Sequence, residues 1–162
     1  MSLFDRENYR WRETFFIFFH ERRRPSVQEI EEAIRHTGGH FQLQDLIGDE
    51  EGRFETATVI APDAYAAIDL VYEAGEEVVE QVEELSRELT PLVADDEERS
   101  KLKRLPQCDA KFDLLHFEQV IDDESEDALD ETFDPGALLL VMEALVTLTE
   151  GVAIDPQSGS AV

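Results

Sequence analysis

The sequence predicts an α+β fold: a ferredoxin-like β-α-β-β-α-β core with an antiparallel sheet, followed by an appended C-terminal helix and strand. Two observations predict this fold. Of the 162 residues, 42% are hydrophobic, which suits one folded domain of ordinary size. Runs with strand periodicity also alternate with runs of helical periodicity along the chain. We expect residues 1–13 to form an N-terminal arm and residues 14–162 a single domain.

The first strand and the first helix have clear local signals. Thr14–His20 is apolar at nearly every position, which predicts a central strand that is covered on both faces. Ser26 and Glu29 have the spacing of a capping box, and the following apolar stripe predicts a helix that ends at Gly38. Chain-connection rules place the first and third strands in the centre of the sheet.

The middle of the chain predicts a hairpin and a long helix. His40–Ile47 and Phe54–Ile60 are β-prone, and the loop between them is rich in glycine and acidic residues, as in a hairpin. Apolar residues keep helical spacing from Pro62 to Leu89, which predicts a helix interrupted at Gly75. An alternative interpretation makes Ala67–Tyr72 a strand.

The last third predicts one more strand, a buried helix and a short final strand. Residues 91–109 are predicted to be a charged connection. Lys111–Gln119 alternates in polarity and is predicted to be the fourth strand. Gly136–Thr149 is apolar on most faces, so we expect this helix to be buried. Val152–Ile154 is the final predicted strand.

Charge is distributed unevenly over a chain whose net charge is −25. Residues 99–111 hold five basic groups and one acidic group, whereas residues 112–162 hold thirteen acidic groups and no lysine or arginine. Such a chain should repel nucleic acid and anionic membranes. Residues 122–134 hold eight acidic groups and are predicted to form an acidic loop. Its partner-binding candidates are Asp122, Asp123, Glu124, Glu126 and Asp127.

Basic residues are expected to gather at one end of the predicted sheet, because the loops that carry them end or begin neighbouring strands. A cluster of this kind is a candidate anion-binding site. Its predicted members are Arg22, Arg23, Arg24, Lys101, Lys103 and Arg104. Local charge balance with Asp49, Glu50 and Glu51 on solvated loops is the simpler interpretation.

Motifs for catalysis, metals and cofactors are not found in the sequence. Cys108 is the single cysteine, so no internal disulfide forms. Nearby basic residues can lower the pKa of a thiol, but a lone cysteine is more often inert, and we expect Cys108 to be inert. The four histidines, His20, His36, His40 and His116, do not have the spacing of a zinc motif. We therefore predict no cofactor, no metal and no catalytic residue. The absence of a signal peptide and of a long apolar run predicts a cytoplasmic protein without a membrane segment.

The C-terminal stretch Glu150–Gly159, EGVAIDPQSG, follows an apolar helix and resembles the end of some small uncharacterised bacterial α+β proteins. The resemblance implies no activity and transfers no site residue. The leading functional hypothesis is a non-enzymatic acidic domain that forms a homodimer or binds a basic protein. One variant of the second option is an immunity or inhibitor protein. The alternative is a small enzyme or a ligand-binding sensor with its site near Arg22–Arg24.

Overall fold

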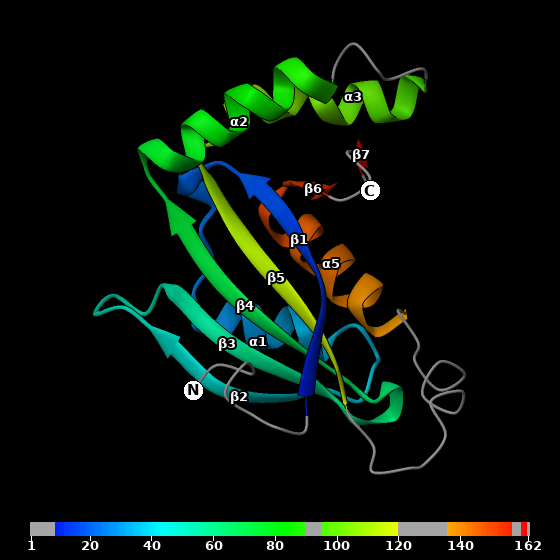
Figure 1. The fold of residues 1–162 in the computed structure, drawn as a ribbon. Helices are drawn as coiled ribbons and strands as arrows, with labels where there is room; N and C mark the ends of the chain where they lie inside the picture. Colours follow the sequence, from blue (N-terminus) through cyan, green and yellow to red (C-terminus); the bar gives the residue numbers. More distant parts are fainter. Residues whose placement is uncertain (1–8, 90–94, 120–135, 157–159, 162) are drawn as a thin grey trace.

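The computed structural model describes residues 9–89, 95–119, 136–156 and 160–161. They form an α+β fold with one seven-stranded sheet in the order β2-β3-β4-β5-β1-β6-β7, in which every pair of neighbours is antiparallel (Figure 1). The strands are β1 (Tyr9–Phe19), β2 (Gln42–Gly48), β3 (Phe54–Ala61), β4 (Ala66–Ala74), β5 (Ala110–Gln119), β6 (Val152–Asp155) and β7 (Ser160–Ala161). The helices are α1 (Val27–Arg35), α2 (Glu76–Leu89), α3 (Asp96–Arg104) and α5 (Gly136–Thr149), with 3-10 turns η2 (Glu21–Arg23), η3 (Pro62–Ala64) and η5 (Leu105–Gln107).

Strand β1 is central and covered on both faces, as its apolar run predicts. It pairs with β5 on one side and with β6 on the other. Ile17 and Phe19 point into one hydrophobic cluster, whereas Phe18 points into a second cluster on the opposite face. These three side chains are between 0% and 1% exposed. The strand begins at Tyr9 rather than at Thr14, so part of the predicted N-terminal arm belongs to the sheet.

Helices α1 and α5 cover one face of the sheet (Figure 1). The capping box of α1 is present, with the Ser26 side chain accepting from the Glu29 backbone N–H at 3.1 Å. Helix α5 spans the predicted residues and buries Leu138, Val141 and Leu145 against the sheet. Burying such aliphatic side chains contributes about 1.5–3 kcal/mol each.

A second layer of helices, α2 and α3, packs on the opposite face at one end of the sheet (Figure 1). Val78 and Val82 of α2, Leu102 of α3 and Leu105 of η5 surround Phe18 in one buried cluster. Helix α3 lies inside the stretch that was predicted to be a charged connection. Its signals are electrostatic: Asp95 caps the first turn, acidic residues follow it, and basic residues fill the last turn, which complements the helix dipole.

The single long helix predicted from Pro62 to Leu89 is wrong, and the alternative strand at Ala67–Tyr72 is confirmed. Strand β4 occupies residues 66–74, and α2 begins only after Gly75. Successive side chains of β4 are buried on opposite faces of the sheet. The apolar residues of this run fit the spacing of a helix and of a strand, and in the structure they form a strand. Gly75 has a φ of +126°, a conformation that favours glycine and separates the strand from the helix.

The ferredoxin-like strand order is also corrected. In that order the first and third strands would be direct neighbours, but β4 lies beside β3, and β5 separates β4 from β1. The physical reason is the extra strand: once residues 66–74 pair with β3, they occupy the position that β1 would have taken. The expected antiparallel pairing of the first strand with residues 110–119 is confirmed.

Candidate anion-binding site

A depression of about 440 Å3 lies where the end of β1, the turn η5 and the end of α5 meet. We call it the arginine pocket. It is lined by His20, Arg22, Arg23, Arg104, Gln107, Cys108, Val146, Thr147, Thr149 and Glu150. Its volume is within the range of about 300–1,000 Å3 that is typical of small-molecule sites.

Two walls of the arginine pocket are tied together by Asp109. The Asp109 backbone N–H donates to the Phe19 carbonyl at 3.1 Å, and one Asp109 carboxylate oxygen accepts from the Glu21 backbone N–H at 2.7 Å. These bonds fix η2, which carries Arg22 and Arg23, against η5, which follows Arg104. The pairing of β1 with β5 therefore brings together basic residues that are some 80 positions apart in the sequence.

The third wall is the end of α5, which is held against β1 by close packing. Thr149 is 1% exposed, and its hydroxyl donates to the Leu145 carbonyl at 2.8 Å. A Cβ at Gly151 would lie 2.7 Å from the Phe18 carbonyl oxygen, so only glycine fits there without a shift. This close approach holds Glu150, which lies between Thr149 and Gly151 in the chain, beside Arg23 of η2.

Charge in the arginine pocket is dominated by three exposed guanidinium groups. Arg23 Nη2 lies 2.6 Å from Glu150 Oε2, and Arg104 Nη1 donates to the Glu150 carbonyl at 3.4 Å. Within the described residues, Arg22 has no carboxylate at ion-pair distance. Guanidinium groups that converge from two segments are suited to bidentate recognition of carboxylate or phosphate groups.

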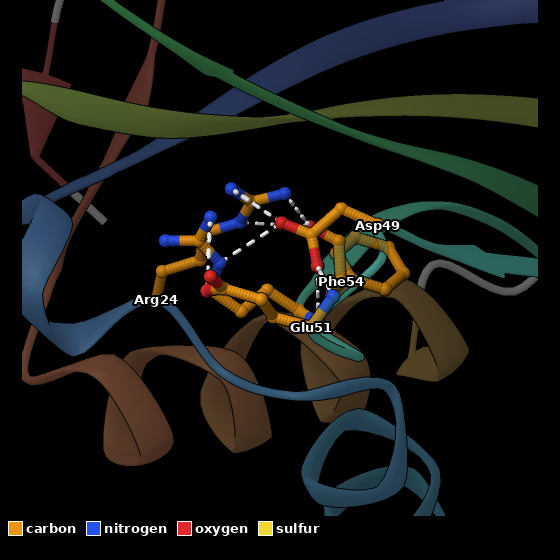
Figure 2. Close-up of polar contacts among 5 residues, drawn as sticks. Arg24, Asp49, Glu51 and Phe54 are labelled. Atoms are coloured by element: carbon orange, nitrogen blue, oxygen red, sulfur yellow. Dashed lines mark hydrogen bonds and ion pairs between the residues drawn. The ribbon is translucent and has the colours of Figure 1, made fainter.

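Arg24, the third residue of the predicted basic run, faces away from the arginine pocket. Figure 2 shows its side chain reaching toward Asp49 and Phe54 at the β2–β3 turn. Its Nε and Nη2 donate to the Phe54 carbonyl at 3.1 and 2.9 Å, and its guanidinium carbon lies 4.0 Å from the centroid of the Tyr72 ring. Only 11% of the Arg24 side chain is exposed. Arg24 therefore ties the end of β1 to the hairpin.

Asp49 completes this structural cluster. Hydrogen bonds from the Arg53 and Glu51 backbone N–H groups, together with the Arg53 side chain at 2.9 Å, lower its pKa. Arg24 Nη1 lies 3.6 Å from the second oxygen of Asp49. The local charge balance considered from the sequence is thus present for Arg24 and Asp49.

Two other predicted members of the basic cluster are not gathered in the arginine pocket. Lys101 and Lys103 lie on α3 but do not line it. The five partner-binding candidates, Asp122, Asp123, Glu124, Glu126 and Asp127, lie outside the described residues.

Cys108 lines the arginine pocket, and its pKa is raised rather than lowered, in agreement with the inert thiol expected from the sequence. Burial raises the pKa of the thiol to about 11, although the Arg104 charge opposes this shift. The thiol lies 3.6 Å from the Arg104 carbonyl. At neutral pH the group is a protonated thiol and therefore a poor nucleophile.

We expect Cys108 to react slowly with iodoacetamide in the folded protein. The alkylation rate should still be rising at about pH 10, because half-ionisation occurs near pH 11, whereas the urea-unfolded chain should level off above about pH 9. Mass spectrometry of timed samples measures both profiles. A folded-state profile that levels off below pH 9 would contradict the assignment.

The histidines do not form a shared site. His20 Nδ1 accepts from the Arg22 backbone N–H at 3.2 Å, and a ring nitrogen of His36 lies 2.6 Å from the Glu32 carbonyl. His116 lies 3.4 Å from Glu13, and burial lowers its pKa. Within the described ranges, no three His, Cys, Asp or Glu side chains are grouped closely enough to hold a metal ion.

A second polar cluster lies on the sheet face that carries α2. Lys111 Nζ is 3.1 Å from Asp113 and 3.4 Å from Glu73, and it lies 4.3 Å from the centroid of the Phe16 ring. Burial raises the pKa of Asp113. Each charge of this cluster is partnered, so it fixes side chains on the sheet rather than presenting open groups to a ligand.

No family model, curated protein or solved structure matches this chain. None of the described helices combines the length and hydropathy that crossing a bilayer requires.

Proposed function

We propose that the protein binds a small anionic ligand in the arginine pocket and acts as a ligand-binding protein or sensor. One observation carries the proposal: Arg22, Arg23 and Arg104, from two distant segments, line one depression of about 440 Å3. The chain has a net charge of −25, so this local concentration of positive charge is opposite in sign to the charge of the whole molecule.

The lining residues favour binding over reaction. The guanidinium groups supply charge-assisted donors, and Gln107, Thr147 and His20 add polar groups for orientation. Val146 supplies apolar surface for the carbon part of a ligand. The Cys108 thiol is protonated at neutral pH because its pKa is about 11.

Inorganic phosphate is the first probe for this proposal. Arg22→Gln and Arg104→Gln should each weaken phosphate binding by about 1–2 kcal/mol, a factor of roughly 5–30, because each variant removes one charge-assisted partner. Isothermal titration calorimetry at constant ionic strength measures the effect, since screening alters such contacts.

Arg35→Gln is the matched control, because it makes the same charge change on α1, where Arg35 pairs with Glu31 outside the arginine pocket. It should leave phosphate binding unchanged. Equal weakening by all three variants would show a nonspecific charge effect, and absence of any anion binding by the wild-type chain would reject the proposal.

Association with a basic protein stays a prediction, because the five acidic residues predicted to bind that partner lie outside the described residues. One described surface favours it. A second depression, of about 480 Å3, is lined by Val79, which is 39% exposed, and by five acidic residues: Glu21, Glu76, Glu80, Glu83 and Asp109. Acidic groups beside exposed apolar surface complement a basic partner.

A further inference from the structure

The arginine pocket already contains an anion that belongs to the chain itself. The Glu150 carboxylate lies 2.6 Å from Arg23. The Glu150 side chain is 63% exposed and the Arg23 side chain is 50% exposed. The Glu150 carbonyl also accepts from Arg104. One residue therefore engages two of the three arginines that a ligand would use.

The backbone holds Glu150 at this position. Helix α5 ends with the Gly151 backbone N–H donating to the Val146 carbonyl at 3.2 Å, and Glu150 has a φ of +55°. This is the left-handed position of a helix C-terminus, which glycine or asparagine usually occupies. Gly151 packs directly on the Phe18 carbonyl. Rotation of the exposed Glu150 side chain is therefore the simplest way for its carboxylate to leave Arg23.

We propose that the arginine pocket takes a doubly charged anion, such as a phosphate monoester or a dicarboxylate, and that Glu150 competes with this ligand for Arg23. The inference rests on the proposed function. The charged lining residues are three arginines and Glu150, which leaves an excess of two positive charges. An anion with two negative charges neutralises that excess.

A second ion pair explains the preference for the dianion. A singly charged anion that takes the place of the carboxylate on Arg23 exchanges one ion pair for another and gains little. A doubly charged anion replaces the same pair and adds a second one with Arg22 or Arg104. The free energy needed to separate Glu150 from Arg23 is the same for both ligands, so only the dianion gains a net ion pair.

The test compares a dianion with a monoanion in the full chain by calorimetry, at about pH 8 where inorganic phosphate is largely the dianion. The probes are phosphate, succinate and acetate at constant ionic strength. The wild-type chain should bind phosphate or succinate at least about tenfold more tightly than acetate. The tighter of the two dianions identifies the ligand as a phosphate or a dicarboxylate.

Glu150→Gln should bind acetate about tenfold more tightly than the wild-type chain, and phosphate at least as much more tightly, because the competing carboxylate is gone. Glu143→Gln is the matched control, since Glu143 lies on the helix that Glu150 follows, is exposed, and does not line the arginine pocket. It should behave as the wild-type chain. Glu150→Asn, which tolerates the left-handed backbone, gives a second variant if the first does not fold by circular dichroism.

Two failures are distinguishable. If phosphate binding persists and depends on Arg104, but Glu150→Gln and Glu143→Gln bind acetate equally, the inference is overturned and the proposed function stands. If neither the wild-type chain nor Glu150→Gln binds any of the three anions, the proposed function itself fails and the inference falls with it.

Discussion

Replacement of Phe18 by alanine is expected to lower the free energy of unfolding by about 3–5 kcal/mol. Phe18 is 0% exposed and lies in the cluster that joins β1 to α2, α3 and η5. Its ring lies 5.8 Å from that of Phe16, centroid to centroid. Removal of the ring leaves a cavity between the sheet and its second helical layer.

Urea denaturation followed by circular dichroism measures this loss. Leu139→Ala is the control, because Leu139 is 49% exposed on α5 and its truncation should change stability by at most about 0.5 kcal/mol. The packing described for α2 and α3 would be contradicted if Phe18→Ala cost no more than Leu139→Ala.

Arg24→Met is expected to destabilise the fold by about 2–3 kcal/mol while leaving phosphate affinity at the arginine pocket unchanged. Methionine keeps the apolar stem of the side chain but removes both donors to the Phe54 carbonyl and the cation over Tyr72. Phe54 is 0% exposed, so its carbonyl would lose partners that water cannot easily replace.

Arg22→Met is the matched variant and should show the reverse pattern. Arg22 is exposed and lines the arginine pocket, so its replacement should change stability by at most about 0.5 kcal/mol and should weaken phosphate binding. Denaturation and calorimetry on both variants give the comparison. If Arg24→Met weakened phosphate binding as strongly as Arg22→Met, the separation into a structural and a ligand-binding arginine would be wrong.

Elements with one dominant local signal were predictable from the sequence. Residues 136–149 are apolar around the whole helix, and Ser26 with Glu29 forms the expected capping box. Residues 66–74 were ambiguous, because alternate burial and helical spacing coincide in a run that is apolar on both faces. Pairing with β3 and β5 makes these residues a strand. The identity of those partner strands cannot be inferred from the residues of the run itself.

The candidate site was predictable only in part. The basic runs around Arg22 and Arg104 were expected at one end of the sheet, and the structure places both in one depression. The separate role of Arg24 depends on the position of the Phe54 carbonyl, which local sequence does not encode. Glu150 was not predicted either. Its nearness to Arg23 arises from the packing of Gly151 on β1. The sequence shows only that a glutamate precedes the glycine that ends the helix, which does not indicate a contact with Arg23.

Joint binding of one anion by Arg22, Arg23 and Arg104 can be followed by NMR, through the arginine Nε–Hε resonances, while inorganic phosphate is added at constant ionic strength. We expect these three resonances to shift along one saturating curve, while those of Arg24 and Arg35 stay in place. Shifts that are linear in phosphate and similar for all arginines would contradict it.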